Sequence, residues 1–375
     1  MRGHNEGSIY QRQDGRYVAA VSVIDAAGKP SRKYFYGGTR AEVSAKLTKA
    51  LRDQQQGIAP PPERETVGTY LARWLDDTAQ PALRPRTFTS YRMIVTRHLV
   101  PALGRKRLSR LTPQDVQAYM NGKRAAGLSA RTVQYHRAVL RKALNDALKW
   151  GLVARNAAAL ATPPKQDKAR RRYLTPAEAR EFLDTVRGHR LEALFTVGLA
   201  LGLRQGEALG LRRQDVDWDS RVLQVGSQLQ RIDGDLTLVE PKSDAGRRAI
   251  PLPEAAVHAL RDHRRRQLEE RVVAGPLWED QDLVFCTQLG RPLDARNVTR
   301  QFHRLREQAG LPWLTFHGLR HGYASLLAAQ GVNPRVAMEL LGHSQLSLTL
   351  EVYTHVAPEL ARDAAARIDR ALGTI

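Results

Sequence analysis

The first part of the chain alternates apolar and polar residues, with turn-forming sequences between the alternating runs. Residues 7–36 contain three such runs, separated by QDG and by DAAGKP, and they predict a three-stranded antiparallel sheet. Thr39 is a suitable N-cap for a helix that runs to about Gln56 and ends at Gly57. A sheet this small needs the helix to cover one face. The other face can then present arginine and lysine side chains to a groove, or contact another protein.

Helical spacing replaces this alternation after the proline-rich sequence IAPPP at residues 58–62. Four helices with apolar residues three and four positions apart are expected in the middle of the chain, at residues 67–75, 87–99, 113–126 and 130–150. Thr112 and Ser129 are suitable N-caps for the last two. Four short helices of this kind predict a small bundle.

The remaining sequence mixes helices with short strands. Helices are expected after the N-caps Thr175 and Thr315, near residues 191–201, and between Asn333 and Gly342. Three apolar runs predict a strand meander, at residues 222–230, 236–240 and 248–252. A last helix is expected from Pro358, with a narrow stripe formed by Leu360, Ala364, Ile368 and Leu372. That stripe can pack on its own domain or on a neighbouring protomer.

A chain of 375 residues exceeds what one hydrophobic core usually serves. The patterns predict a multidomain α+β protein. Its expected parts are a sheet-and-helix domain at 1–57, a linker at 58–65, a helical bundle at 66–163, a basic linker at 164–172, and a mainly helical domain with a small antiparallel sheet at 173–375.

The number and distribution of charged residues predict a binding partner. The chain has 59 Lys and Arg against 38 Asp and Glu, a formal net charge of +21. Residues 84–165 hold 17 basic residues against two acidic ones, whereas residues 166–375 hold 30 against 27. A bundle with so few acids would repel itself without a polyanion, so the middle domain is predicted to bind nucleic acid.

The location of the basic residues refines this prediction. In the helix at 130–150, the expected apolar stripe consists of Val133, Leu140, Leu144 and Leu148. Four basic residues can lie off this stripe and contact a duplex: Arg131, Arg141, Lys142 and Lys149. Arg171 and Arg172, in the basic linker, are further candidates for DNA contact.

Several classes of protein are disfavoured by what the sequence lacks. Its longest apolar stretch, residues 193–203, is too short to span a bilayer, and the N-terminus does not resemble a signal peptide. Cys286 is the only cysteine, so neither an intrachain disulfide nor a thiolate cluster can form. It is expected in the core. These features predict a cytoplasmic, nucleoid-associated protein without membrane contact.

Three segments concentrate side chains that bind phosphate or attack it. Arg204 lies in GLRQGE, just before a predicted helix; His317 and Arg320 lie in TFHGLRH; His343 and Tyr353 lie in LGHSQLSLTLEVYTH. A guanidinium fork matches two non-bridging phosphate oxygens. Arg204 would also lie at the positive end of a helix, where cations are disfavoured, and a bound anion would resolve that conflict.

Each of these residues also has an ordinary structural explanation. An arginine at a helix start is usually a surface residue, a histidine after a helix C-terminus interacts with the helix dipole, and a tyrosine usually packs in a core. His317 and His321 have the spacing of a helical zinc pair, but Arg320 would project its charge into that site and no carboxylate or cysteine is near. A metal is therefore not predicted.

The three segments resemble the signature boxes of the tyrosine site-specific recombinases, the phage integrase family. The resemblance implies that Tyr353 attacks the scissile phosphate and forms a 3′-phosphotyrosyl intermediate. It further implies that Arg204, Arg320 and His343 stabilise the five-coordinate transition state and that His317 assists proton transfer. No cofactor is implied.

The resemblance also implies a general acid on a β-turn. Lys242, in the turn PKSDAG at residues 241–246, matches the lysine that protonates the leaving 5′ oxygen in this family. A turn lysine is otherwise simply solvated. Arg247 and Arg248, just beyond the turn, are weaker candidates for the same role.

By resemblance, residues 1–57 form an arm-type DNA-binding domain, 66–163 a core-binding, SAM-like domain, and 173–375 the catalytic domain. The implied partners are double-stranded attachment sites of core and arm type, further copies in a homotetramer on DNA, a host DNA-bending protein and an excision factor. The implied function is to integrate or excise a mobile element such as a phage. A type IB topoisomerase and a noncatalytic DNA-binding regulator are the alternatives.

Overall fold

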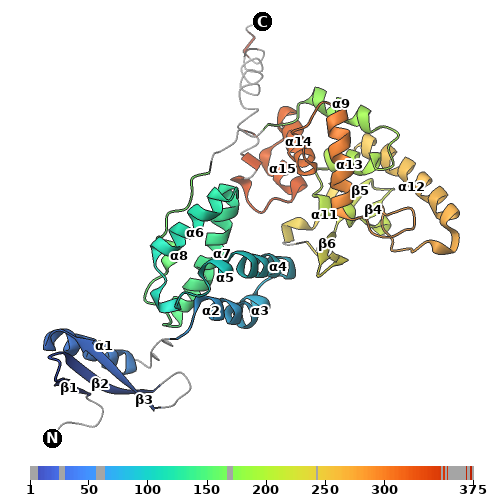
Figure 1. The fold of residues 1–375 in the computed structure, drawn as a ribbon. Helices are drawn as coiled ribbons and strands as arrows, with labels where there is room; N and C mark the ends of the chain where they lie inside the picture. Colours follow the sequence, from blue (N-terminus) through green and yellow to red (C-terminus); the bar gives the residue numbers. More distant parts are fainter. Residues whose placement is uncertain are drawn as a thin grey trace. The chain divides into compact units, whose positions relative to one another are not determined.

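The structure is a computed structural model of the whole chain. It describes residues 7–24, 30–55, 64–166, 172–241, 244–347, 349–350, 353, 369 and 372–373, and the statements below concern these residues. The chain divides into two compact units, residues 1–169 and 170–375 (Figure 1). None of the described helices is long and apolar enough to cross a membrane.

The first unit begins with the expected antiparallel sheet. Its strands pair in the order β1 (Ser8–Gln11), β2 (Tyr17–Ile24) and β3 (Pro30–Gly37). Helix α1 (Arg40–Gln55) covers one face, where Val43 and Leu47 pack on Ala19 and Val21. The Thr39 hydroxyl accepts a hydrogen bond from the backbone N–H of Glu42, as a cap should.

The uncovered face of the sheet differs from the one expected. Tyr10 and Tyr36 both pair with Val18, so the three side chains share the face opposite α1. Tyr10, Tyr34 and Tyr36 are each about half exposed, and the guanidinium of Arg32 lies 6.0 Å from the ring of Tyr34. This open face therefore presents aromatic rings with an arginine, rather than arginine and lysine alone.

Two bent helical segments follow. The helices of this part are α2 (Val67–Trp74), α3 (Gln80–Ala82), α4 (Pro85–Ile94) and α5 (Val100–Leu103). A π-turn joins α2 to α3 at Leu75–Ala79, and another joins α4 to α5 at Val95–Leu99. In both cases a proline, Pro81 or Pro101, follows within two residues. Proline lacks an N–H group, and the wider π-turn lets the helix continue past it. The helix predicted at 87–99 is therefore a longer segment, from Pro85 to Leu103, which is interrupted by a π-turn.

The last three helices complete the bundle: α6 (Pro113–Ala125), α7 (Ala130–Lys149) and α8 (Ala157–Leu160). Thr112 and Ser129 cap α6 and α7, each accepting a backbone N–H from the third helical residue. The buried side of α7 includes Val133, Leu140 and Leu144. Leu148, predicted to belong to that stripe, is 41% exposed, because the stripe follows Ala143 and Ala147 instead.

The buried side of α7 also carries His136, which makes the bundle sensitive to acid. The side chain shares a 2.8 Å hydrogen bond with the Tyr119 hydroxyl, and burial, with the charges of His98 and Lys123, lowers the pKa of His136 to about 4. An unfolded histidine titrates near pH 6.5, so the unfolded state binds more protons between these values and stability falls as the pH drops through that window. We expect the free energy of unfolding in urea to be about 2 kcal/mol lower at pH 4.5 than at pH 7 from this group. The difference should shrink in His136→Gln; an equal pH dependence would contradict this assignment.

The second unit is mainly helical. Its helices are α9 (Pro176–Val186), α10 (Glu192–Ala200), α11 (Gln205–Leu209), α12 (Glu254–Ala274), α13 (Ala295–Gln308), α14 (Phe316–Ala329) and α15 (Pro334–Leu341). Helix α10 has no charged residue after its first position and is buried on nearly every side, against α9, α11, α12 and α14. Four phenylalanine rings join these helices in the core, with centroids 5.4 to 6.2 Å apart: Phe182, Phe195, Phe302 and Phe316.

The predicted strand meander is wrong in its connections. Strands β4 (Val216–Asp217), β5 (Val222–Val225) and β8 (Arg248–Pro251) form one sheet, while β6 (Gln228–Ile232) and β7 (Asp235–Val239) form a separate hairpin. The run predicted as one strand breaks after Val225. There the Ser227 hydroxyl donates to the Gly210 carbonyl, 2.7 Å away, and draws the chain onto α11.

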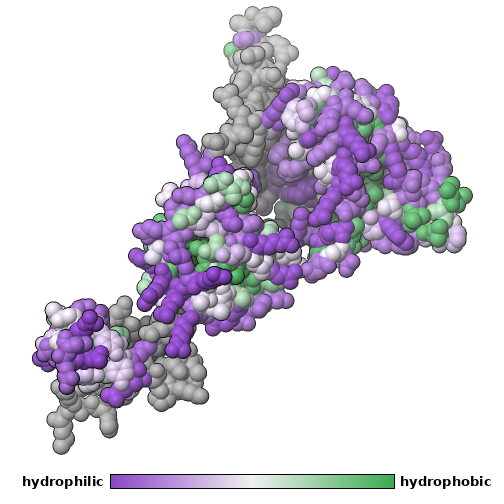
Figure 2. All heavy atoms as spheres, viewed as in Figure 1, coloured by the Kyte–Doolittle hydropathy of each residue, from purple (hydrophilic) through white to green (hydrophobic). Residues whose placement is uncertain are grey.

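The face of the two units that Figure 2 shows is mostly hydrophilic. One exposed hydrophobic patch lies at the C-terminal end of α12 and includes Val272, Val273 and Leu277. Cys286 is buried, as predicted.

Candidate active site

Arg204 is the N-cap residue of α11, with extended backbone just before the helix. Its Nη1 donates to Oε1 of Glu207 over 2.5 Å, and its Nη2 donates to the carbonyl of Gly342 over 3.0 Å. The Arg204 side chain keeps 39% of its surface exposed. The carboxylate of Glu207, in the first turn of the same helix, already supplies a negative charge that offsets the conflict expected between Arg204 and the positive helix end.

Glu207 is the only acidic residue that the described structure places in this cluster. Its side chain is 3% exposed and also accepts a 2.9 Å hydrogen bond from Nη2 of Arg248. Burial would raise the pKa of this carboxyl, but the hydrogen bonds and charges of Arg248 and Arg204 outweigh burial and lower it. Glu207 therefore stays ionised between two guanidinium groups.

Arg320 belongs to α14 and is almost fully buried, with 2% of its surface exposed. Sequence spacing places it on a face with His317, yet His317 is exposed. The guanidinium of Arg320 donates to the carbonyls of Gly202, 2.8 Å away, and of Leu341. Burial, followed by the charge of Arg204, lowers the pKa of Arg320. In the part of the chain that the structure describes, its guanidinium is bonded to these carbonyls and not to a carboxylate, although the charge of Glu207 acts on it.

His343 directly follows α15, which ends at Gly342 in the left-handed conformation. Its Nδ1 shares a 2.9 Å hydrogen bond with the hydroxyl of Thr349. Burial and the charges of Arg320 and Arg204 lower the pKa of His343 to about 4, so the imidazole is neutral at pH 7. A neutral imidazole with one nitrogen engaged can donate or accept a proton at the other, and an anion bound beside it would raise its pKa.

His317 and His321 lie one turn apart on α14, with ring centroids 4.7 Å apart in an edge-to-face arrangement. His321 is near enough to His343 to influence its pKa. No group of three potential metal-binding side chains occurs among the described residues. His321 thus borders the cluster of Arg204, Arg320 and His343, and His317 packs on the other side chain of the pair, that of His321.

Tyr353 is held apart from these groups. Its hydroxyl donates a 2.7 Å hydrogen bond to the carbonyl of Val332, in the loop between α14 and α15. Burial raises the pKa of this phenol. Of the neighbours expected beneath its ring, Leu350 is 42% exposed, whereas Val352 and Val356 lie outside the described residues. The hydroxyl of Tyr353 is therefore already bonded within its own unit.

Some of the predicted site residues fall outside what the structure describes. Lys242 and Arg171 are among them, as is most of the helix expected from Pro358. Arg172 is described, and it lies 4.6 Å from the ring centre of Trp313 and donates to Glu178 over 2.6 Å. This arginine therefore has partners within its own unit.

Gly342 ends α15 next to the cluster of Arg204, Arg320 and His343. A Cβ atom at this position would lie 2.5 Å from the carbonyl oxygen of Ala245 and 3.0 Å from Nη1 of Arg248. We expect Gly342→Ala to destabilise the protein by about 2 kcal/mol and to reduce activity, because the Gly342 carbonyl that Arg204 binds must move. Gly331→Ala is the matched control, since Gly331 is also left-handed but has no atom within 4 Å of its Cβ position. Melting curves with equal losses for both variants would contradict this packing argument.

A second candidate surface lies on α7. Arg131, Lys142 and Lys149 are exposed, and at 100° per residue they fall within about 20° of one another around the helix. Tyr135 shares this side and packs edge-on against Tyr91 of α4, with ring centroids 6.2 Å apart. Arg141, also exposed, lies about 80° away. The result is a basic side of α7 with exposed aromatic rings beside it.

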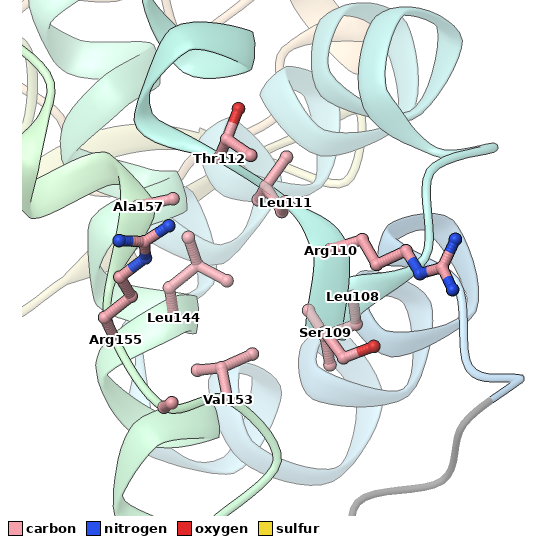
Figure 3. Close-up of a pocket in the computed structure, with 10 residues that line it drawn as sticks. Leu108, Ser109, Arg110, Leu111, Thr112, Leu144, Val153, Arg155 and Ala157 are labelled. Atoms are coloured by element: carbon pink, nitrogen blue, oxygen red, sulfur yellow. The ribbon is translucent and has the colours of Figure 1, made fainter. Parts of the chain in front are cut away.

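A small cavity of about 130 Å³ opens on the other side of α7, lined by Leu108, Leu111, Leu144 and Val153 (Figure 3). Arg110 and Arg155 stand at its edges. None of the predicted site residues lines this cavity.

Known sequences and structures resemble most of the chain. The profile of the phage integrase family matches residues 172–359, and that of the phage integrase N-terminal SAM-like domain matches residues 66–124. The tyrosine recombinase XerC-like protein of Caldanaerobacter subterraneus is 30% identical, over 93% of this chain and 95% of the relative. The Tn1549 transposon integrase in complex with a circular intermediate DNA is 25% identical, with a TM-score of 0.70 over 81% of this chain and 99% of that one. A lambda integrase bound to a core site shares the fold, with 20% identity and a TM-score of 0.59 over 94% of this chain and 96% of that chain.

Proposed function

The chain belongs to the phage integrase family, and on that basis we propose that it is a site-specific recombinase that cuts and rejoins double-stranded DNA. We infer that it integrates or excises a mobile element, such as a phage or a transposon. The observation that carries this proposal is the convergence of Arg204, Arg320 and His343 in one cationic cluster, in which the described residues include a single carboxylate.

The charge of the cluster suits a phosphoryl-transfer transition state. Arg204, Arg248 and Arg320 contribute three positive charges and Glu207 one negative charge, so the neutral His343 leaves a net charge of +2. A phosphodiester carries one negative charge and gains a second when a phenolate attacks it. The cluster would therefore neutralise the five-coordinate phosphorus as its charge develops.

The proposed reaction uses side chains alone. The oxygen of Tyr353 forms a bond to phosphorus while the bond from phosphorus to the 5′ oxygen breaks, and Lys242 supplies the proton that the leaving 5′ oxygen takes up. As the tyrosine oxygen bonds to phosphorus, its proton passes to the imidazole of His317. One phosphodiester replaces another of similar free energy, so a 5′ hydroxyl from a second duplex can reverse the step and join new partners without ATP.

Exchange between two duplexes requires four cuts, and each chain supplies one tyrosine. We therefore assign the active assembly to a homotetramer on DNA. Residues 1–57 would bind arm-type sites through the open tyrosine-bearing face of the sheet, residues 66–163 would bind core-type sites through the basic side of α7, and residues 173–375 would perform the chemistry. A DNA-bending protein and an excision factor would set the direction of the reaction.

The basic side of α7 gives a prediction for DNA affinity. Replacing both Lys142 and Lys149 with alanine removes two phosphate contacts, so the slope of log affinity against log salt should become shallower by about two. Electrophoretic mobility shifts at several salt concentrations measure this slope. Arg110→Ala, at the cavity on the opposite side of α7, should leave the slope unchanged. Equal slopes in all three proteins would rule out the α7 surface.

The experiment that tests the function as a whole uses duplexes that the protein selects from a random-sequence pool. A nick placed a few nucleotides 3′ of the scissile bond leaves the released 5′ hydroxyl on a short fragment. This fragment diffuses away, so the covalent intermediate is trapped. We expect a covalent adduct, stable to denaturation, on a 3′ phosphate, and strand exchange between two selected duplexes. Adduct without exchange, together with relaxation of any supercoiled plasmid, would indicate a topoisomerase; binding without adduct would indicate a regulator.

A further inference from the structure

Arg248 is the most extensively bonded basic side chain next to the candidate active site. It is the first residue of β8, and its side chain is 6% exposed. Its guanidinium donates in three directions: Nε to the carbonyl of Leu340 over 2.7 Å, Nη1 to the carbonyl of Gly246 over 3.1 Å, and Nη2 to Glu207 over 2.9 Å. One side chain thus joins the turn before β8, the first turn of α11 and the end of α15.

The neighbouring arginine behaves differently. Arg247 is exposed and forms a surface ion pair with Glu240, in which the two side chains keep 57% and 78% of their surface. From the sequence alone, Arg247 and Arg248 are equal candidates for a role in proton transfer. Burial and bonding now separate them, because only Arg248 has its donors committed to fixed acceptors within the unit.

These contacts link Arg248 to Arg204 and His343, the residues proposed to bind the phosphate. The two oxygens of Glu207 are shared, with Oε1 accepting from Arg204 and Oε2 from Arg248. Leu340 lies three residues before His343, and Arg204 binds the carbonyl of Gly342 between them. A displacement of Arg248 would therefore reach both Arg204 and His343, although Arg248 itself is not exposed to substrate.

We propose that Arg248 is a positioning residue for DNA cleavage, which holds Glu207 and the end of α15 so that Arg204 and His343 meet the scissile phosphate in the correct geometry. This inference rests on the proposed function. Three acceptors in three directions suit the planar fork of arginine, and the single ammonium of lysine cannot satisfy them together.

The charge balance explains why the loss of Arg248 would affect chemistry. Without it, Glu207 would remain buried with Arg204 as its one direct partner, beside Arg320. The carboxylate would then hold Arg204 more tightly and offset its charge, so less of that charge would act on the phosphate. Removing the carboxylate as well should release Arg204 again.

The test compares four variants in single-turnover cleavage of the nicked duplex at saturating protein. We expect Arg248→Met to cleave about 100-fold more slowly than the wild type, with DNA affinity changed less than about threefold. Arg248→Lys should recover only part of the loss. Arg248→Met combined with Glu207→Gln should cleave about tenfold faster than Arg248→Met alone. Arg247→Met is the matched control and should stay within about twofold of the wild type.

A pH profile separates positioning from a general loss of structure. Among the described residues, the charged groups that face Glu207 are Arg204, Arg248 and Arg320, so the loss of Arg248 removes one of these cations and raises the pKa of Glu207. Because a protonated Glu207 is neutral, as glutamine is, cleavage by Arg248→Met should become faster as the pH falls through this raised pKa, and the double variant should show no such rise. Melting curves and DNA binding identify variants that fail to fold.

Two results would overturn the assignment: wild-type cleavage in a folded Arg248→Met, or a double variant no faster than the single variant with an unmoved pH profile. A failure of the proposed function looks different. In that case the wild type itself and Arg247→Met would form no adduct.

Discussion

Replacing Tyr353 with phenylalanine should abolish the covalent protein–DNA adduct and reduce strand cleavage by at least about 10⁴-fold. The substitution removes only the oxygen, which in this structure donates to the carbonyl of Val332. Because a single hydrogen bond contributes about 1 kcal/mol, the variant should stay folded and bind DNA as the wild type does. Denaturing gels of the trapped nicked substrate measure the adduct directly.

Tyr323→Phe is the matched control for this experiment. Tyr323 lies on α14 in the same unit, and burial raises the pKa of its phenol too, but it does not match the position of the family's nucleophile. It should form adduct at the normal rate. An adduct that persists in Tyr353→Phe and vanishes in Tyr323→Phe would transfer the role to the second tyrosine.

Arg320→Lys should lower the rate of cleavage by about 10³-fold while keeping the positive charge. The guanidinium uses two of its donors on the carbonyls of Gly202 and Leu341 and has others left for a phosphate. An ammonium group cannot hold both carbonyls and a phosphate in one plane. Since the side chain is enclosed, the variant should also melt at a lower temperature.

The readout that isolates the chemical effect is single-turnover cleavage below the melting temperature of the variant, with affinity for the intact duplex measured in parallel. Arg306→Lys is a suitable comparison, because Arg306 also donates to a backbone carbonyl, that of Leu314, in the same unit. Cleavage by Arg320→Lys at the wild-type rate would mean that charge alone suffices. Equal losses in both variants would mean that the effect is structural.

Much of the fold follows from local signals in the sequence. The caps Thr39, Thr112, Ser129, Thr175 and Thr315 all fix helix starts at the expected residues, because a hydroxyl at an N-cap satisfies a backbone N–H locally. The family could also be predicted from the sequence, because each of its motifs is a short continuous segment. Local signals fail where pairing is long-range, and the connections of β5, β6, β7 and β8 could not be predicted for that reason.

The sequence could name Arg204, Arg320 and His343, which lie together in the structure, but it could not predict the electrostatics of their cluster. Arg204 and Glu207 are three residues apart at a helix start, a spacing that indicates an ion pair, yet nothing in the sequence links them to Arg248, 41 residues later. The burial of Arg320 is likewise a property of the tertiary structure. Sequence periodicity assigns a charged residue to the surface, and only the carbonyls of Gly202 and Leu341 explain its place in the interior.

The bond between Tyr353 and Val332 bears on what a solitary copy of this protein can do inside a cell. Under the proposed function, the Tyr353 hydroxyl must leave the carbonyl of Val332 before it can reach a scissile phosphate. Random encounters with the host chromosome would then leave no broken strands. A copy that keeps this bond could therefore move along the chromosome without cutting it, and no separate inhibitor would be needed.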